Sequence, residues 1–252
     1  MVNRLGGVFV LACATFAAPA RPVLAQQTLN LSLGHFALSS EGRVETDILL
    51  IEHADLVFDV NDFDGVAIGG ELLVPIGNLF EAGAGVSYSQ RTVSTVDERW
   101  ANSDGSRIPR DLGYRQFPVT LTVRVLPLGQ SYSVQPYIGG GVALIVWAFS
   151  ESGDWVERHT SRPPHLPRNE PTALAPDRSV FRGERYRATG IATGTTALLG
   201  LRVTRDAIAL GVEGRYQRAL GSFGSSFARV LDPDINLDGW TLQFTTGLRF
   251  GE

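Results

Sequence analysis

The stretch Trp240–Phe250, "WTLQFTTGLRF", alternates between apolar and polar residues along its whole length. Side chains of a β-strand point to opposite faces in turn. One face therefore carries Trp240, Leu242, Phe244, Thr246, Leu248 and Phe250, and the other carries Thr241, Gln243, Thr245, Gly247 and Arg249. A tilted strand needs about 9–11 residues to cross a bilayer. The segment therefore predicts a membrane-crossing β-strand.

Four further segments show the same period of two: 29–34, 80–89, 117–125 and 208–215. The remaining strand candidates are 66–75, 134–149 and 187–203, and the two faces of 134–149 are less distinct. The connections between the eight segments alternate in length. Those at 39–65, 91–114, 150–186 and 221–237 are long, and those at 76–78, 127–133 and 204–206 are short. Up-and-down transmembrane barrels have short periplasmic turns and long extracellular loops. We predict an all-β fold, an eight-stranded antiparallel transmembrane barrel formed by residues 26–252.

The first long connection contains "VETDILLIEHADLVFDVNDFDG" at 44–65, which is too apolar for an ordinary loop. Two interpretations are open. The segment is either a short helix that caps the mouth of the barrel, or a hairpin that raises the number of strands to ten.

The N-terminal segment 1–25 has the features of a secretory signal peptide. Arg4 precedes the apolar run Leu5–Ala18, and the small residues of Val23–Ala25 indicate cleavage before Gln26. Cys13 is the only cysteine and lies in this segment. The exported domain is therefore expected to have no disulfide, thiol nucleophile or thiolate metal site.

The charge distribution argues against nucleic acid as a partner. The net charge is −4, all 22 basic residues are arginine, and no long block of like charge occurs. A nucleic-acid-binding surface would show a basic patch or stripe. No cofactor is expected either.

The chain resembles the small eight-stranded outer-membrane β-barrel proteins of bacteria, the OmpA/OmpX-type barrels. The likeness rests on the signal peptide, the strand pattern, the loop lengths, "PYIGGGV" at Pro136–Val142 and the final strand. It implies a monomer in the outer membrane that contacts membrane lipid and lipopolysaccharide. It also implies that the barrel-assembly machinery reads the final strand through Trp240, Leu242, Phe244, Leu248 and Phe250. In the family the terminal aromatic is usually the last residue, whereas here Gly251 and Glu252 follow it.

The polar face of the strands carries seven charged residues: Glu71, Glu81, Glu213, Arg124, Arg202, Arg215 and Arg249. An eight-stranded barrel is only wide enough to be filled by side chains. Charges there must be paired, because an isolated buried charge is costly. The pattern predicts a lumen plugged by Glu/Arg pairs and a structural, envelope-integrity or surface-interaction role. A narrow pore for small solutes is the alternative.

The sequence gives weaker support to two other classes of function. An envelope lipid-modifying enzyme would need a Ser–His pair with a carboxylate. His35 lies near Ser39, and His159 and His165 lie near Ser161, but no third partner is evident, so no catalysis is expected. A soluble lipocalin-like binding barrel would turn the apolar face inward. Alternation alone does not decide which face is inside.

Asp234, Asn236 and Asp238 reproduce the opening of a calcium loop, D-x-N-x-D-G. Such a loop needs a bidentate carboxylate at position twelve, which is Thr245 here. We interpret the stretch as a turn into the last strand and keep the three residues as a weak metal candidate. The arginines of the 150–186 connection alternate with acidic residues, which indicates a solvated loop of mixed charge.

Overall fold

The computed structural model describes residues 26–53, 55–102, 104–156, 172–173, 180–223 and 234–251. Its strands are β1 (Gln27–Leu38), β2 (Gly65–Ile76), β3 (Phe80–Ala101), β4 (Arg107–Val125), β5 (Val134–Val156), β6 (Thr172–Ala173), β7 (Val180–Arg205), β8 (Ile208–Ser222), β9 (Asp234–Asn236) and β10 (Gly239–Phe250). Two short helices, α1 (Ile48–His53) and η1 (Val60–Phe63), lie between β1 and β2. The predicted all-β barrel is confirmed.

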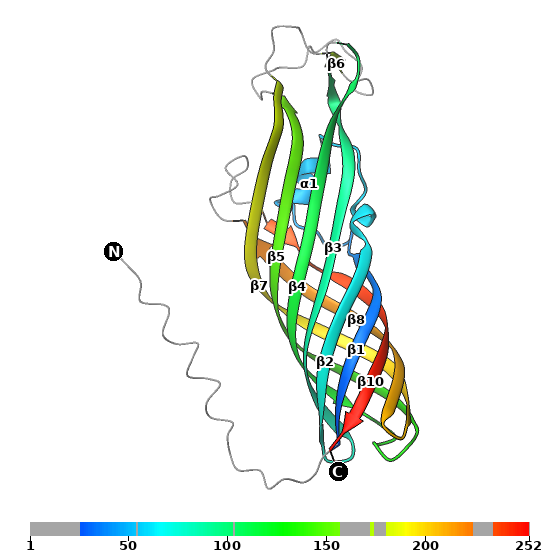
Figure 1. The fold of residues 1–252 in the computed structure, drawn as a ribbon. Coiled ribbons are helices and arrows are strands. Elements are labelled where there is room, and N and C mark those ends of the chain that lie inside the picture. Colours follow the sequence, from blue (N-terminus) through cyan, green and yellow to red (C-terminus); the bar gives the residue numbers. More distant parts are fainter. Residues whose placement is uncertain are drawn as a thin grey trace, which may run out of the picture.

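Eight strands close into a ring in the order β1, β2, β3, β4, β5, β7, β8, β10. All neighbours in the ring are antiparallel. The last strand closes the ring because it pairs on both sides, with Phe250 opposite Gln27 of β1 and Leu248 opposite Ile208 of β8. The C-terminus and the short connections lie at the lower end in Figure 1. Gly77, in the β2–β3 turn, has a positive φ of 67°, which favours glycine.

Four strands rise far above the other four, a feature that the sequence analysis did not predict. The segments 91–114 and 150–186 were expected to be loops, but most of their described residues extend β3, β4, β5 and β7 (Figure 1). The prediction was wrong because the alternation continues beyond the predicted ends with different residue types. Ile108, Leu112 and Tyr114 are buried, whereas the outward positions between them are Pro109, Asp111 and Gly113, none of which has a large apolar side chain.

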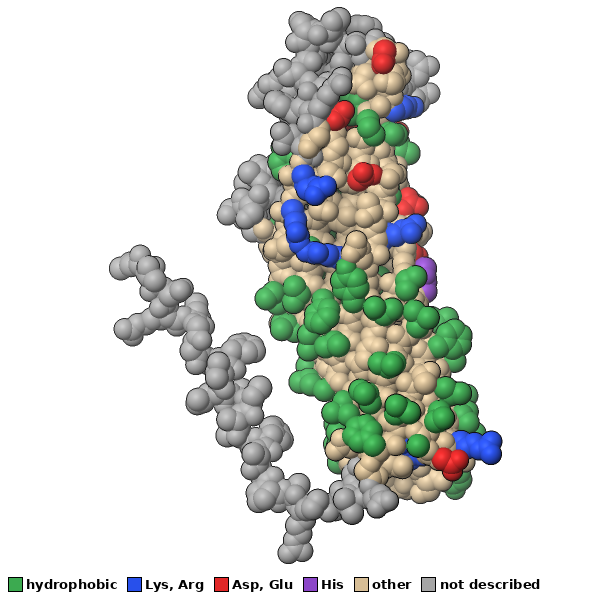
Figure 2. All heavy atoms as spheres, in the orientation of Figure 1, with side chains coloured by type: hydrophobic (Ala, Val, Ile, Leu, Met, Phe, Trp, Pro, Cys, Tyr) green, Lys and Arg blue, Asp and Glu red, His purple; other side chains and the backbone are tan. Residues whose placement is uncertain are grey.

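The outward face of the lower barrel forms an apolar belt. Figure 2 shows it as a green zone with charged side chains above and below it. Leu31 is 64% exposed and Phe244 71% exposed. The belt covers Phe117–Val125 of β4 and nearly all of β10, close to the about 9–11 residues that a tilted transmembrane strand needs. Apolar residues lie outside and charges inside, the opposite of a soluble lipocalin-like barrel.

The segment 44–65 forms helices α1 and η1 and adds no strand to the ring, so the capping-helix interpretation is confirmed. Asp59 caps η1 through the backbone N–H of Asn61. Within the described chain, no helix is long and apolar enough to cross a membrane. We call residues 39–64 and 234–238 the cap.

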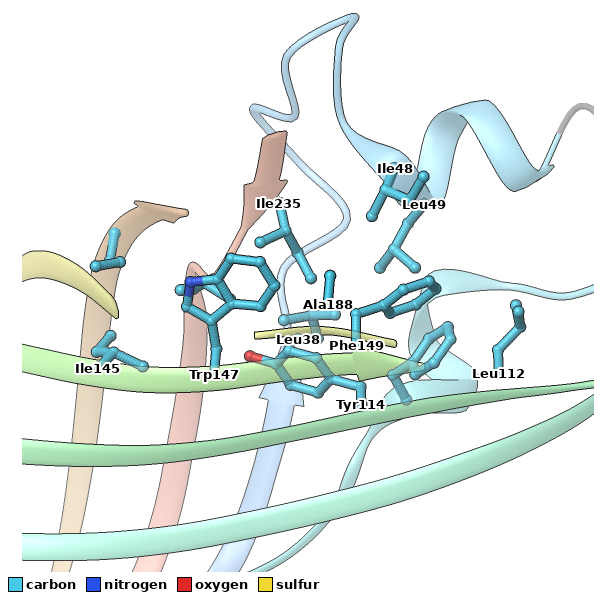
Figure 3. Packing of buried hydrophobic residues seen from close by; sticks show 14 of the residues in the cluster. Leu38, Ile48, Leu49, Leu112, Tyr114, Ile145, Trp147, Phe149, Ala188 and Ile235 are labelled. Atoms are coloured by element: carbon cyan, nitrogen blue, oxygen red, sulfur yellow. The ribbon is translucent and has the colours of Figure 1, made fainter. Parts of the chain in front are cut away.

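The cap closes the mouth by packing an apolar core against the raised strands. Ile48 and Leu49 of α1 and Ile235 of β9 point toward the sheet, where Trp147 and Phe149 face them (Figure 3). All five are almost fully buried. The upper half of this barrel therefore contains an apolar core like that of a soluble domain.

Candidate functional site

The bore of the lower barrel contains a cluster of buried charges that we call the plug: Glu71, Arg124, Glu213 and Arg215. Arg124 Nη2 forms ion pairs with Glu71 and with Glu213, the latter at 2.8 Å to Oε2. Arg215 Nη2 lies 2.9 Å from Glu213 Oε1 and 3.2 Å from Glu71 Oε2. Each carboxylate therefore contacts both arginines. This arrangement offsets the cost of burying each charge, which would be several kcal/mol for an isolated ion.

Neutral polar side chains complete the plug. Tyr137 donates its hydroxyl to Glu213 Oε2 at 3.0 Å, and its ring lies 4.7 Å from the guanidinium carbon of Arg124. Gln243 donates to Glu213 Oε1 at 2.9 Å, and Thr122 donates to Glu71 Oε1 at 2.9 Å. These partners come from β4, β5 and β10, so the plug cross-links strands from around the ring.

A second cluster, the lower pair, lies nearer the end of the barrel that holds the short connections. Arg202 contacts Glu81 in bidentate fashion, at 2.7 Å and 3.3 Å. Gln135 accepts two further hydrogen bonds from Arg202, at 2.9 Å and 2.6 Å. Bidentate arginine–carboxylate contacts are geometrically specific and stronger than neutral hydrogen bonds.

Two inward-facing glycines provide the space that the plug occupies. A Cβ at Gly200 would collide with the ring of Tyr137, and a Cβ at Gly83 would collide with Thr122 and with the carboxylate of Glu71. These two glycines therefore make room for the larger side chains of Tyr137, Thr122 and Glu71.

Six of the seven predicted lumen charges join these two clusters, and Arg249 does not. Arg249 is partly exposed near the end of β10, and no described carboxylate forms an ion pair with it. The structure separates it because it lies one residue before the end of the barrel wall, where water reaches the guanidinium.

Above the plug lies a cavity of about 30 Å³, bordered by Asn30, Glu71, Thr120 and Arg215 among other polar groups. A space of this size holds about one or two water molecules. Gln116 and Gln217 close it from above, where Gln217 donates to Gln116 at 2.8 Å and Tyr114 donates to Gln116 at 3.0 Å. The apolar core of the cap lies directly above these two glutamines.

The three weak metal candidates accept hydrogen bonds from the protein itself, two of them from backbone N–H groups. Asn236 Oδ1 accepts from the N–H of Asp238, and Asp238 Oδ1 accepts from the N–H of Ala219, both at 2.7 Å. Asp234 accepts from the hydroxyl of Thr46 at 2.9 Å. In the described chain no group of three or more His, Cys, Asp or Glu residues could hold a metal ion.

The buried carboxylate of Asp47, outside the membrane, connects the two halves of the cap. Asp47 accepts from Arg43 at 2.9 Å, and also from the N–H groups of Leu49 and Asn236 at 2.9 Å and 2.7 Å. Burial raises the pKa of Asp47, and the charge of Arg43 and the two backbone donors counteract that rise. Burial likewise raises the pKa of Asp97, against the lowering effect of Arg110.

The histidines show no catalytic arrangement within the described chain. His35 Nε2 lies 4.0 Å from Asp64 and its side chain is 62% exposed, while His53 contacts the ring of Phe58. His159 and His165 lie outside the described residues, as does the predicted signal peptide 1–25. The expectation that the chain is no enzyme stays a prediction.

Sequence reasoning missed the neutral members of the bore: Tyr137, Gln135, Gln243, Gln116 and Gln217. A signal existed for Tyr137, Gln135 and Gln243, because each occupies an inward position of a predicted strand, whereas Gln116 and Gln217 lie just outside 117–125 and 208–215. The "PYIGGGV" stretch hid Tyr137, since its glycines make the two faces of that strand look alike.

No family model and no curated protein matches the chain. The solved structures similar to this chain include the following three. The outer membrane protein OprG from Pseudomonas aeruginosa matches 90% of this chain and 97% of its own, with 12% identity and a TM-score of 0.49. Neisserial surface protein A matches 89% and 97%, with 12% identity and a TM-score of 0.42. Ail, the attachment invasion locus protein of Yersinia pestis, matches 90% and 99%, with 12% identity and a TM-score of 0.40.

The eight strands form a closed ring, and the ring has an apolar belt on its outer face. The fold is that of an outer-membrane β-barrel. In such a barrel the lower end in Figure 1, with the short connections, faces the periplasm, and the cap and raised strands face outward.

Proposed function

We propose that the protein is an integral outer-membrane barrel with a closed bore, whose role is structural or concerns contacts at the cell surface. The observation that carries this proposal is that side chains occupy the bore at successive levels along its length. The lower pair, the plug, the small cavity and the apolar cap follow one another from the periplasmic end outward. A path for solutes would have to pass all of them.

Planar-bilayer recording of the purified protein tests the closed bore. We expect no steady channel openings from the wild type, and a porin of known conductance measured in parallel provides the positive control. Discrete openings of wild-type protein would support the alternative of a narrow pore. The polar cavity beside Arg215 is the one feature of the described bore that favours that alternative.

We further propose that the barrel resides in the outer membrane as a monomer and that the assembly machinery reads its last strand. The outward positions of that strand, among them Leu242, Phe244 and Leu248, support both ideas because they face lipid in the finished barrel. Cell fractionation tests the location. We expect extraction only with detergent, whereas release from the envelope by salt or alkali alone would contradict the proposal.

A further inference from the structure

We propose that a groove on the outer face of β4, β5 and β7 binds the phosphate groups of a phosphorylated lipid of the outer leaflet, which in a bacterial outer membrane is lipopolysaccharide. The inference rests on the proposed membrane location and names a partner for that surface. The groove has a volume of about 350 Å³ and lies on the part of the strands that rises above the apolar belt. Figure 2 shows basic side chains gathered there, directly above the green zone.

Positive charge predominates in the groove. Four arginines border it, Arg91, Arg115, Arg185 and Arg187, against the single carboxylate of Asp111. Asp111 already accepts a hydrogen bond from Ser94 at 2.7 Å. Within the described part of the chain, no carboxylate forms an ion pair with Arg115, Arg185 or Arg187. Their guanidinium groups are exposed, and arginine matches phosphate in bidentate geometry.

The strand register places the arginines around a floor of small residues. Arg115 lies opposite Ala148 of β5, and Arg187 lies opposite Ser150 of the same strand. The two arginines thus flank β5 from β4 and β7, offset by two residues along the strand and therefore about 12 Å apart at the backbone. Between them the floor consists of Gly113, Ala148 and Ser150, which leave space for a phosphate and offer a hydroxyl donor.

An apolar groove continues downward from the arginines into the belt. Its volume is about 200 Å³, and it shares Arg115 and Ala148 with the groove above. Tyr88, Phe117 and Val146 border it, and all three are well exposed. Phe117 follows Arg115 by two residues on the same face, so the charge-to-apolar transition occurs within about 7 Å. A headgroup phosphate with an acyl chain below it matches this order, whereas a free anion would use only the upper half.

Binding of purified lipid A to the full chain in detergent micelles, measured by native mass spectrometry, tests the proposal. We expect the double variant Arg115→Gln/Arg187→Gln to bind lipid A about a hundredfold more weakly, or about tenfold for each arginine, equivalent to about 1.4 kcal/mol each. The double variant Arg107→Gln/Arg205→Gln is the matched control. Arg107 is exposed on the outward face of β4 near its upper end, and Arg205 is exposed at the periplasmic end of β7. We expect this control to bind like the wild type.

Changing the ligand provides a test that needs no variant. Dephosphorylated lipid A should bind at least about tenfold more weakly than the phosphorylated form, and inorganic phosphate at the same concentration should not displace it. Equal binding of both lipids, or equal loss in the two double variants, would overturn the proposal. Displacement by inorganic phosphate would also overturn it and would assign a site for free anions. Because the assay uses purified protein, these results are independent of the fractionation experiment that tests the membrane location.

Discussion

Arg124 is the residue on which the plug depends most. It is 1% exposed and pairs with both Glu71 and Glu213, so its removal leaves two buried carboxylates with only Arg215 between them. We expect Arg124→Leu to lower the free energy of unfolding by about 3–5 kcal/mol, as for other broken buried ion pairs. Urea unfolding in micelles, followed by the gel shift of the folded barrel, measures the loss.

Arg218→Leu is the control for this experiment. Its side chain is 78% exposed and lies 3.9 Å from Asp238, so the expected loss is about 0–1 kcal/mol. If both variants lose the same small amount, the plug does not contribute to stability as its geometry indicates.

Asp238 provides a second test at the scale of one residue, because it separates backbone capping from calcium binding. Asp238→Ala leaves the partly buried N–H of Ala219 without its acceptor and should lower the free energy of unfolding by about 1–3 kcal/mol. Calcium or EDTA should not change the melting temperature of the wild type. A rise of that temperature with calcium that is lost in the variant would show a metal site after all.

At the scale of the element, β10 closes the ring and presents one apolar face to lipid. We expect Phe250→Ser to reduce the amount of assembled barrel in cells, because it removes the aromatic at the end of the proposed assembly signal. Phe250 pairs with Gln27 at the edge of the barrel and is 47% exposed, so little core packing is lost. The heat-modifiable fraction of the outer-membrane pool measures assembly.

Thr246→Ser is the matched control on the same face of β10, since it keeps the strand pattern and removes only one methyl group. Normal assembly of Phe250→Ser together with normal stability would show that the machinery does not read this aromatic.

At the scale of the whole molecule, the barrel and the cap are held by different forces. The barrel wall consists of continuous hydrogen-bonded strands, whereas the cap is held by apolar packing above the membrane and by the Arg43–Asp47 pair. We expect Ile235→Asp to loosen the cap without unfolding the barrel, because it places a charge against Trp147 in an apolar core (Figure 3).

Limited proteolysis of intact cells measures this effect as faster cleavage within 39–64, while the gel shift reports the barrel. Val57→Asp is the control, because Val57 belongs to the cap but is 53% exposed. Loss of the gel shift in Ile235→Asp would mean that cap and barrel unfold as one unit.

The sequence by itself determined the eight strands of the ring, the division of most of them into an apolar and a polar face, and six of the charges that meet in the bore. These features follow from the period of two, which is local: each residue's face depends only on its place in its own strand. The confined bore of an eight-stranded barrel then requires the charges to pair. Which of these charges form pairs depends on contacts between strands and is not determined by the local pattern. Arg249 is an example: it lies on the polar face of its strand, which predicts a place in the bore, but its position near the strand end leaves it partly exposed.

Only the tertiary structure decided how the outer half is built. The raised parts of β3, β4, β5 and β7 have the alternation of strands but the polar outward composition of loops, so composition predicted loops. The cap depends on contacts between distant segments, such as Asp47 with Asn236, which lie 189 residues apart. The arginine groove likewise forms only because the register places Arg115 and Arg187 on either side of β5. Such pairings depend on the energy of the whole fold, and no short stretch of sequence contains them.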